Sequence, residues 1–389
     1  MEGRPGLDAR LLTSRLFLSC GEPSGDLYAG ALTRELRRSV PDLEVVGLGG
    51  PQFAAAGGRL LADYRGLAAT GLTEAVSKIP QSFAVLRRLI ASAHEARPDA
   101  VVVIDFPEIN FRLARGVRDL NVPVIYYVCP QVWAWRQGRL KTIREVANQV
   151  LVIFPFEEEL YQRAGVPVRF VGHPLVDLMK PSVSRGAFLA ARGLAGDAPT
   201  VAILPGSRPN EVRRILPILV AGAQRVKASV PRVQFVVARA PGLGDQLFAP
   251  AAPSLMTVVS GDTDTVLASA DLALTASGTA TVQCALHDTP MVVVYRLSPL
   301  TYRLGRPLVK VDTFAMVNLI ANERLVPELI QDACTPEAVA REAISLLTDP
   351  ARTSRMRAGL ARVRARLGGS GASRRAADAI LQTAGLAGS

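Results

Sequence analysis

Short apolar runs alternate along the chain with longer stretches in which apolar and polar residues recur at helical spacing. The runs are rich in Val, Ile and Leu without regular polar alternation, which is typical of parallel strands buried on both faces. After the first run, Tyr28, Leu32 and Leu36 share one face of a predicted helix. Runs of the strand type lie at residues 15–20, 44–50, 101–105, 122–128, 150–154, 168–172, 200–208, 233–239, 256–260, 271–277 and 290–296.

The alternation is interrupted once, at residues 179–199, by a stretch rich in Pro, Gly and small residues. Two series of strand–helix alternation separated by a linker predict two doubly wound α/β domains, whose ligands bind at the carboxyl ends of the strands. We expect an amino-terminal domain over 1–178, a second domain over 179–369 and a binding cleft between them. The Gly-rich end of the second domain precedes a last short helix, and we expect residues 370–389 to pack back on the first domain.

Composition narrows the class of partner. The formal charge is +11, the pI is about 10.0, and apolar residues make up 49% of the chain against 5% aromatic. This balance favours an anionic membrane surface or a phosphorylated substrate over nucleic acid. The chain has no continuous apolar run of about eighteen residues and no signal-peptide pattern, so we expect no spanning helix and no secretion. Four separated cysteines and three histidines indicate reduced cytosolic thiols and no dedicated zinc site.

Residues 204–217 form a predicted turn between a buried strand and a helix. At this turn Gly206 and Ser207 would expose backbone amides at the start of the helix, and Arg208 adds a cation. Such a turn suits a diphosphate or a phosphate leaving group. An ordinary strand-to-helix turn with a surface arginine explains the same residues equally well.

A second turn of this kind lies within residues 275–290. Ser277, Gly278 and Thr279 open the next helix at the carboxyl end of the same predicted sheet. Gln283 lies one turn further and is either a ribose contact or a solvated helix residue. Two such turns in one domain favour a nucleotide-diphosphate site more strongly than either turn does alone.

Acidic residues follow the strands of the first domain. Asp105 ends one buried strand, where a carboxylate facing a cleft is well placed to act as a base. A turn or helix-capping aspartate is the alternative. Glu22 and Asp26 take a comparable place after the first strand, and Ser24 or Asp26 could cap the helix that follows.

Two further signals are weaker. His173 stands alone at a strand end, where a histidine is usually structural. Asp262 and Asp264 form a D-x-D triplet that would suggest a metal–nucleotide site, but such a triplet is common by chance and this one lies in a predicted turn.

Apolar residues recur at helical spacing beside cations within residues 70–90. Most such stretches are core-facing helices, whereas an exposed apolar face rimmed by cations would suit a lipid chain or a membrane interface. A later arginine-rich segment is either a solvated helix or a surface for anionic lipid. The apolar positions are Leu72, Val76, Ile79 and Phe83 beside Lys78, Arg87 and Arg88, and the later arginines are Arg352, Arg355, Arg357, Arg362, Arg364 and Arg366.

Longer motifs occur in one order along nearly the whole chain. They are GEPSGD, GLGGPQF, TGLTEAV, IDFPEIN, YYVCPQVWAWR, FPFEEELY, FVGHPLVD, LPGSRPNEV, SGTATVQ with PMVVVYR, and VNLIANERLVPELIQ. Together they resemble lipid-A-disaccharide synthase, the inverting glycosyltransferase family of lipopolysaccharide assembly. The resemblance implies a GT-B fold, in which two Rossmann-like domains face an interdomain cleft, and a reaction that needs no metal or other cofactor. It further implies transfer of 2,3-diacylglucosamine from UDP-2,3-diacylglucosamine to 2,3-diacylglucosamine 1-phosphate (lipid X), giving UDP and a β-1,6-linked disaccharide 1-phosphate.

The resemblance also implies residue roles. Asp105 matches the family's essential aspartate and would be the general base on the acceptor 6-hydroxyl. Arg208 matches the arginine of the PGSR loop and would stabilise the departing UDP. Glu22 matches a polar residue of the site, and with Ser24 it would face the acceptor, while Gly25 permits the tight turn between strand and helix.

On the nucleotide side, the resemblance places Gly206 and Ser207 with Arg208, and it places Ser277, Gly278, Thr279, Gln283 and Asn318 at the UDP-sugar. The chain departs from the family at four places. The family usually has Glu at the position of Gln283 and Leu-Pro at the position of Met316 and Val317, and it commonly has Met at the position of Phe53 and Asp at the position of Glu108.

The implied partners are UDP-diacylglucosamine, lipid X and the anionic inner-membrane surface, with the protein peripheral on the cytoplasmic face. The flexible segment 366–373 would permit a homodimer that exchanges its C-terminal helix. Two other hypotheses remain open. A UDP-sugar transferase or epimerase acting on a soluble sugar predicts that residues 70–90 are buried core, and a membrane- or polyanion-binding protein that has lost catalysis is disfavoured by the intact Asp105 and Arg208.

Overall fold

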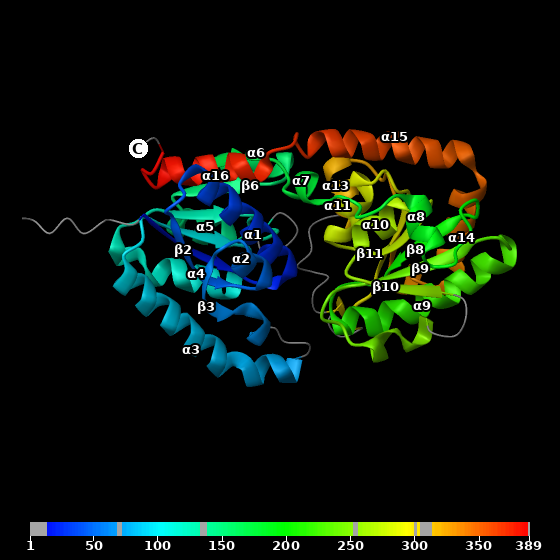
Figure 1. Ribbon diagram of the computed structural model, residues 1–389, viewed down its shortest axis with the longest axis horizontal. Coiled ribbons are helices and arrows are strands. Elements are labelled where there is room, and N and C mark those ends of the chain that lie inside the picture. Colours follow the sequence, from blue (N-terminus) through cyan, green and yellow to red (C-terminus); the bar gives the residue numbers. More distant parts are fainter. Residues whose placement is uncertain are drawn as a thin grey trace, which may run out of the picture.

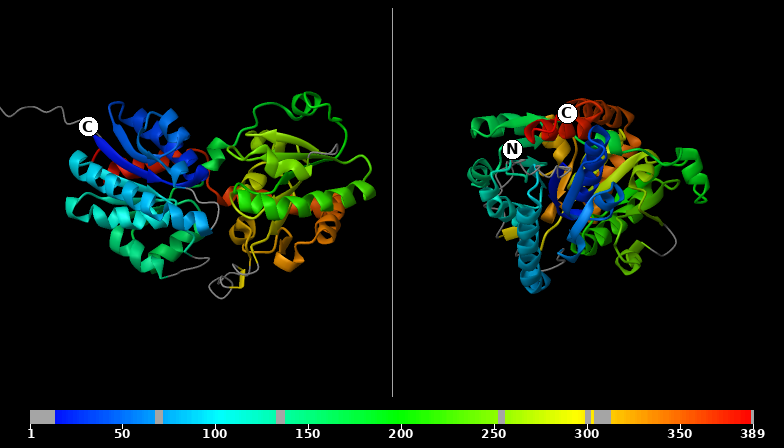
Figure 2. Two further views of the ribbon diagram at one scale, coloured as in Figure 1. Left: turned by 90° about the horizontal axis from the view of Figure 1, so that it is seen from below. Right: turned by 60° about the vertical axis from the view of Figure 1, so that its left-hand side comes forward.

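Two parallel β-sheets lie side by side in the computed structural model of the chain (Figure 1), and each carries helices on both faces (Figure 2). The structure describes residues 14–67, 72–132, 138–251, 256–298, 302–303 and 313–387, and within 72–78 it describes the backbone alone. The predicted two-domain α/β architecture is confirmed. No helix of these ranges is long and apolar enough to cross a membrane.

The first sheet has seven strands, all parallel, and β1 and β4 lie at its centre. Its strand runs contain Val, Ile and Leu because both faces are covered, so no face needs polar residues. In sheet order the strands are β3 (Arg59–Asp63), β2 (Glu44–Gly49), β1 (Arg15–Cys20), β4 (Ala100–Ile104), β5 (Val124–Tyr127), β6 (Gln149–Val152) and β7 (Val168–Phe170).

Alternate residues of β1 serve the two faces of this sheet. Leu16 and Leu18 join a core cluster that includes residues of α1 and α16, whereas Phe17 joins a second cluster with residues of α3 and α4. Helix α16 comes from the far end of the chain and packs against α1. The helices of this half are α1 (Glu22–Ser39), α2 (Pro51–Ala55), α3 (Leu72–Ala96), α4 (Pro107–Gly116), α5 (Arg139–Val146), α6 (Pro155–Arg163), α7 (Leu175–Leu178) and α16 (Ala372–Thr383).

The second sheet has six parallel strands, with β8 and β11 at its centre. In sheet order they are β10 (Met256–Ser260), β9 (Gln234–Arg239), β8 (Thr200–Leu204), β11 (Leu272–Ala276), β12 (Met291–Tyr295) and β13 (Glu328–Ile330). The helices of this half are α8 (Arg185–Ala190), α9 (Pro209–Ser229), α10 (Thr263–Ala268), α11 (Thr279–Leu286), α13 (Met316–Ala321), α14 (Pro336–Thr348) and α15 (Pro350–Arg366). Helices α9 and α14 pack together, and α15 packs on α11 and α13.

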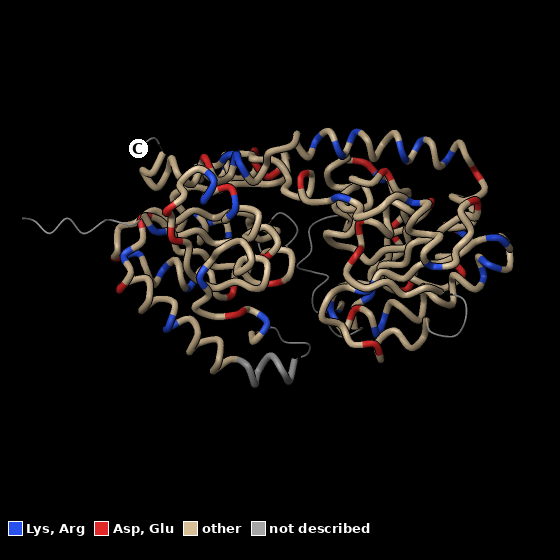
Figure 3. The backbone as a smooth tube through the Cα atoms, in the orientation of Figure 1, with Lys and Arg blue, Asp and Glu red and all other residues tan. Residues whose placement is uncertain are grey.

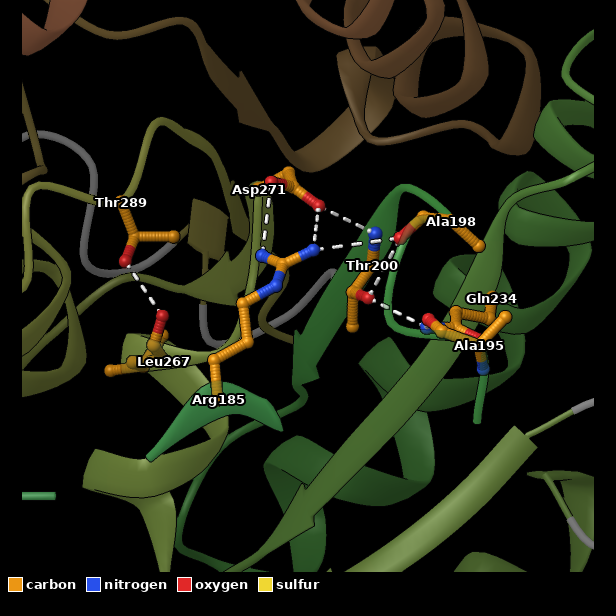
Figure 4. A network of polar contacts seen from close by, with 8 residues as sticks. All are labelled: Arg185, Ala195, Ala198, Thr200, Gln234, Leu267, Asp271 and Thr289. Carbon is orange, nitrogen blue, oxygen red and sulfur yellow. Dashed lines mark hydrogen bonds and ion pairs between the residues drawn. The ribbon is translucent and has the colours of Figure 1, made fainter. Parts of the chain in front are cut away.

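Polar side chains fasten the amino ends of the second sheet's strands (Figure 4). The guanidinium of Arg185 donates to both carboxylate oxygens of Asp271, at 3.0 and 2.9 Å, and the same carboxylate accepts the amide of Thr200 at 2.8 Å. Gln234 donates to the hydroxyl of Thr200 at 2.9 Å. These contacts hold the strands together at their amino ends, and in a doubly wound domain a ligand binds at the opposite, carboxyl edge.

Two strands were missed by the sequence pattern, β3 and β13, and both lie at sheet edges. Strand β3 is exposed or half-buried throughout, and β13 is only three residues long. A long run of buried β-branched residues is the signal for a central strand, and an edge strand with partial burial carries little of it.

The chain crosses between the two halves twice, and the two crossings are tied to each other. Asp177 lies in α7, just before the first crossing. Its carboxylate accepts the amides of Gly371 and Ala372 and so caps α16. The amide of His173 donates to the Leu367 carbonyl at 2.8 Å. Burial lowers the pKa of the His173 imidazole to about 3, so this side chain is a neutral packing residue, as its isolated position predicted.

Candidate functional site

Asp105 directly follows strand β4, at the carboxyl edge of the first sheet. Asp105 and Phe106 both have left-handed backbone conformations, with φ of 43° and 47°. Consecutive left-handed residues other than glycine cost on the order of 1–3 kcal/mol each, and they persist only where the surroundings hold them. The strained backbone thus includes the residue that the sequence predicts as a base.

The pKa of the Asp105 carboxyl is raised from its ordinary value of 3.8 to about 6. Burial is the largest cause, and the negative charges of Glu22 and Glu108 add to it. The Phe106 amide and the Arg208 cation act in the opposite direction but do not cancel these effects. A carboxyl with a pKa near 6 is ionised at neutral pH yet basic enough to accept a proton from a hydroxyl during a reaction.

Glu22 reaches the same place from the start of α1. It too has a left-handed backbone, with φ of 64°. The residue before it is Gly21, and a Cβ atom at that position would lie 2.4 Å from the ring of Phe106. Only glycine therefore allows the turn after β1 to pack against the turn after β4, which brings the two carboxylates together.

Asp26 of the first turn caps a different helix from the one that its position predicts. The carboxylate of Asp26 accepts the amides of Gly50, Gln52 and Phe53 at 2.8 to 3.0 Å, so it caps α2 rather than its own helix. Gly25 is buried against β1 and β4 and serves packing. Ser24 is half-buried and makes no capping hydrogen bond.

Arg208, at the start of α9, joins the two halves of the site. One of its terminal nitrogens donates to both carboxylate oxygens of Glu22 at 2.8 Å. Both side chains are about half exposed, at 61% and 47%, and an ion pair of this kind contributes only about 0–1 kcal/mol. A bound diphosphate can therefore replace Glu22 as the partner of Arg208 at little cost. A second contact between the halves joins the Gln131 amide to the Met316 sulfur at 3.9 Å.

The predicted phosphate loop is already occupied by a carboxylate of its own helix. Glu211 folds back, and its Oε2 atom accepts the amides of Ser207 at 3.2 Å and Arg208 at 3.3 Å. The same carboxylate pairs with the Arg208 side chain at 3.4 Å. Gly206 has φ of 121°, and a Cβ there would lie 2.6 Å from Glu211. The amides of Ser207 and Arg208 thus hold the loop in shape, which differs from the prediction that they stand ready for a ligand.

The second predicted turn lies beside this loop, after β11. The hydroxyl of Ser277 donates to the Phe314 carbonyl at 2.8 Å, so it fastens the turn to the segment before α13. Gly278 has φ of 145°, and no atom lies within 4 Å of a Cβ built there. Thr279 is exposed at the first position of α11. The Gly278 carbonyl accepts the amide and the hydroxyl of Thr281, so of these three residues Thr279 and the Gly278 amide are the groups left for a ligand.

Asn318 and Gln283 face inward. Asn318 is only 2% exposed, its amide group donates to the Val326 carbonyl and to Glu328, and its oxygen accepts the Val326 amide. Such contacts make it a support of the 313–328 segment, in contrast to the direct nucleotide contact that the resemblance implies. The amide of Gln283 lies 3.1 Å from the Met179 sulfur in the first crossing segment, and the side chain is half-buried.

The helix that the spacing within residues 70–90 predicts is present as α3. Ile79 and Phe83 are 49% and 41% exposed, which makes them two of the most exposed large apolar side chains among the described residues. The guanidinium of Arg112 lies 4.9 Å above the Phe83 ring. The side chains of Leu72 and Val76 lie outside the described residues. The exposed face does not fit the buried helix that the soluble-sugar hypothesis requires.

The D-x-D triplet has structural partners. Asp262 caps α10 through the Thr265 amide and accepts the Ser182 hydroxyl at 2.9 Å, and Asp264 pairs with His287 at 3.0 Å. Within the described ranges, no three His, Cys, Asp or Glu side chains are grouped to hold a metal ion.

Several residues at or next to the site were not identified by the sequence patterns. Glu211 carried a usable signal, because a glutamate three residues after the residue that starts a helix is the spacing of a capping box. Ser19 of β1 and Tyr126 of β5 also carried a usable signal, because a polar side chain inside a strand that is buried on both faces requires a hydrogen-bond partner. The stacking of Tyr295 on Phe314, with ring centroids 5.7 Å apart, had no local signal.

The arrangement brings a base and a cation from different sheets to one place. Asp105 can accept a proton from a hydroxyl group, and Arg208 can stabilise negative charge on a leaving phosphate. An activated hydroxyl and a stabilised leaving group are what a displacement at a sugar carbon requires.

Comparison with known proteins agrees with this chemistry. A family model described as lipid-A-disaccharide synthetase matches residues 16–382. The lipid-A-disaccharide synthase of Myxococcus xanthus is 42% identical over 371 residues, which cover 95% of this chain and 97% of that relative. The enzyme of the same name from Geobacter metallireducens is also 42% identical, over 377 residues, with the same coverage.

Solved structures of low sequence identity share the fold. A UDP-GlcNAc 2-epimerase from Neisseria meningitidis, bound to UDP-GlcNAc, has a TM-score of 0.70 at 12% identity and covers 95% of this chain and 100% of that one. The calicheamicin glycosyltransferase CalG4 has a TM-score of 0.61 at 17% identity and covers 97% of this chain and 100% of that one. The epimerase and the transferase show the two-domain architecture alone, whereas the family match covers nearly all of the sequence. This chain therefore belongs to the lipid-A-disaccharide synthase family.

Proposed function

We propose that the protein transfers 2,3-diacylglucosamine from UDP-2,3-diacylglucosamine to the 6-hydroxyl of 2,3-diacylglucosamine 1-phosphate. The observation that carries this proposal is the meeting of Asp105 with Arg208 through Glu22, because the two groups come from different domains and serve the two ends of one displacement. We assign residues 1–178 and the C-terminal helix to the acceptor, and residues 179–369 to the donor.

The reaction follows from these groups. The Asp105 carboxylate takes the proton of the acceptor 6-hydroxyl as that oxygen attacks the anomeric carbon of the donor. The bond from the anomeric carbon to the phosphate oxygen breaks, and both of its electrons leave with UDP. Because attack and departure occur on opposite faces of the sugar, the configuration inverts. Arg208, which exchanges Glu22 for the diphosphate, stabilises the charge that develops there.

Glu22 and the second domain's loops complete the assignment. Once Arg208 binds the diphosphate, Glu22 and Ser24 are left beside the acceptor. There the Glu22 carboxylate can accept hydrogen bonds from sugar hydroxyls. Gly278 and Thr279 bind the donor through backbone and hydroxyl groups. The support from Asn318 and Ser277 keeps this turn in place.

We further propose that the exposed face of α3 contacts the anionic cytoplasmic surface of the inner membrane. Ile79 and Phe83 supply apolar area, and Arg87 and Arg88 are exposed on the same helix. A diacylated acceptor lies in such a membrane, so contact there would bring lipid X to the acceptor domain. The homodimer with exchanged C-terminal helices stays a prediction from the sequence, and mass measurement in detergent tests it.

Reconstitution tests the proposal directly. The purified protein, given UDP-2,3-diacylglucosamine and lipid X in detergent, should form UDP and the disaccharide 1-phosphate in equal amounts. Asp105→Asn should lower kcat by about 10²–10⁴, because the loss of a general base costs on that order. A correctly folded protein that forms no disaccharide would refute the proposed function, and an Asp105→Asn variant with normal turnover would refute the assignment of the base.

A further inference from the structure

A buried polar network lies directly beneath Asp105. Asn110, in α4, has no exposed surface. Its side-chain nitrogen donates to the carbonyl of Asp105 at 2.6 Å and to that of Ile104 at 3.1 Å. Its side-chain oxygen accepts the hydroxyl of Ser19, in β1, at 2.6 Å. The Asn110 side chain thus links the ends of β1 and β4 with Asp105, which directly follows β4.

A third strand contributes Tyr126. Its hydroxyl donates to the same Asp105 carbonyl at 2.8 Å, and its ring is fully buried in β5. Burial raises the pKa of this phenol well above its ordinary value, so the hydroxyl remains a donor. The amide of Asp105 donates to the carbonyl of Val128 at 2.9 Å. Both backbone polar groups of Asp105 are therefore fixed by β5 and α4.

The network converges on the most strained part of the described backbone. Glu22, Asp105, Phe106 and Val128 are all left-handed, and they stand after β1, β4 and β5, three consecutive strands of the sheet. A left-handed β-branched residue such as Val128, with φ of 55°, is rare and indicates that its position is imposed. Without its two donors, the Asp105 carbonyl would be free to rotate toward an ordinary conformation and carry the side chain with it.

We propose that Ser19, Asn110 and Tyr126 are positioning residues of the transfer reaction, which hold Asp105 in its strained, half-buried conformation. They do not touch the substrates and act only through the backbone of Asp105. The inference rests on the proposed function, in which Asp105 is the base. It goes further by assigning a catalytic consequence to three buried residues outside the substrate contacts.

A purely structural task would predict a different pattern. Buried polar groups require partners in any fold, and their loss lowers stability. Tyr127 offers the comparison, because it is also fully buried in β5 but belongs to the cluster on the opposite face of the sheet. Removal of the Tyr127 hydroxyl, which makes no hydrogen bond to Asp105, should leave turnover unchanged, whereas removal of the Tyr126 hydroxyl should change the chemistry of Asp105.

The test compares Tyr126→Phe with Tyr127→Phe in the full-length protein. Tyr126→Phe should lower kcat about tenfold to a hundredfold, since a displaced catalytic group costs on that order, while the KM of each substrate stays nearly constant. Ser19→Ala, which removes the donor to Asn110, should give a smaller loss of the same kind and serves as the second variant if Tyr126→Phe folds poorly. Tyr127→Phe should keep the turnover of the unmodified enzyme.

The second readout is the pKa of the Asp105 carboxyl, measured by carbon NMR of protein labelled at the aspartate carboxyl carbons and assigned with Asp105→Asn. A released carboxyl gains solvent and moves from its charged neighbours, so its pKa should fall from about 6 toward 3.8, and the acid limb of the pH–rate profile should move to lower pH. The groups that face Asp105 are Glu22 and Tyr28 of α1, Glu108 of α4, Tyr126 of β5, Cys129 after β5 and Arg208 before α9.

Each outcome decides one claim. Unchanged kcat and an unshifted Asp105 pKa in Tyr126→Phe would overturn the positioning role, even where Asp105→Asn is inactive. An active Asp105→Asn would overturn the proposed base, while the NMR titration would still report whether the network holds the carboxyl. Equal losses in Tyr126→Phe and Tyr127→Phe, with no change of pKa, would reduce the network to a folding element.

Discussion

The two domains use the same edge of the same kind of sheet, but they bear backbone strain on different residue types. Near the site in the first domain, the left-handed residues include Glu22, Asp105 and Phe106. In the second domain the corresponding positive φ values belong to Gly206 and Gly278. Glycine adopts such conformations without steric cost, and other residues do not.

The strained residue types differ because each domain contributes a different chemical group to the proposed reaction. A diphosphate can be bound by backbone amides, so the loops of the second domain can use glycine at their tight positions. In the proposed reaction the base must be a side chain, so Asp105 cannot be exchanged for glycine and the first domain has to bear the strain. The hydrogen bonds of Asn110 and Tyr126 to the Asp105 carbonyl stand where that strain is greatest.

Among variants of the second domain, the largest expected effect concerns its cation, Arg208. Arg208→Ala should lower kcat/KM by about 10²–10³, the usual cost of one donor to a developing negative charge. Arg208→Lys retains the charge without the forked donors and should recover only part of the rate. Steady-state kinetics with both substrates measure these losses. If Arg208→Ala retained more than half of the normal kcat/KM, another group would have to stabilise the leaving UDP.

The proposed membrane contact offers a second comparison between the domains. Helices α3 and α15 lie on opposite sides of the molecule (Figure 1), and arginines recur along α15 (Figure 3). On α15, Arg362 pairs with Glu323 and Arg364 with Asp288, and the arginines that remain exposed without such a partner include Arg355. Helix α3 carries Ile79 and Phe83, two of the exposed large apolar side chains among the described residues, whereas the large apolar residues of α15, Met356, Leu360 and Val363, are buried.

Serine at both Ile79 and Phe83 should lower the fraction of protein that sediments with anionic phospholipid vesicles by about tenfold, because each exposed apolar side chain contributes on the order of 1 kcal/mol. The matched control replaces Arg355 and Arg357 by serine and should reduce binding much less. A larger loss in the control would place the membrane contact on α15.

The raised pKa of Asp105 should appear in the stability of the protein. A carboxyl whose pKa is higher in the folded state favours folding below about pH 4, and this contribution disappears as pH rises through about 6. Asp105→Asn should therefore be more stable than the unmodified protein at pH 8, by about 1–2 kcal/mol once solvent screening is allowed for, and equally stable at pH 4. Urea unfolding at the two pH values measures the difference. Equal stability of the two proteins at pH 8 would mean that the ionised Asp105 carboxylate does not destabilise the fold.

The smallest effect should come from Glu211, which keeps the phosphate loop in shape. Glu211→Gln should raise the KM for the nucleotide sugar by about threefold to tenfold, because a neutral oxygen accepts the loop amides less strongly than a carboxylate does. Glu337→Gln, at the first turn of α14 and far from the site, is the control. Tighter binding of UDP by Glu211→Gln would instead identify Glu211 as a competitor of the diphosphate.

Much of the fold was predictable because its signal is local. The central strands are runs of buried Val, Ile and Leu, and the positions of Asp105 and Arg208 follow from where those runs end. Edge strands β3 and β13 were not predictable in this way, since partial burial and short length remove the signal.

The internal organisation of the site was less predictable, because it depends on contacts between distant segments. Asp26 looks like a cap of its own helix, and only the fold brings the start of α2 to it. Asn318 looks like a ligand contact, yet its amide is used within the protein by Val326 and Glu328. A sequence motif identifies which residues matter, and three-dimensional packing decides which of them touch a ligand.

The central claim is a division of labour, in which the first domain supplies the base and the second binds the nucleotide. Calorimetric titration of UDP into Asp105→Asn and Arg208→Ala tests it most directly. We predict that Asp105→Asn binds UDP as tightly as the unmodified protein, and that Arg208→Ala binds it at least about tenfold more weakly, the loss expected for one charged hydrogen-bonding partner. Loss of UDP binding in Asp105→Asn, or normal binding in Arg208→Ala, would contradict the account.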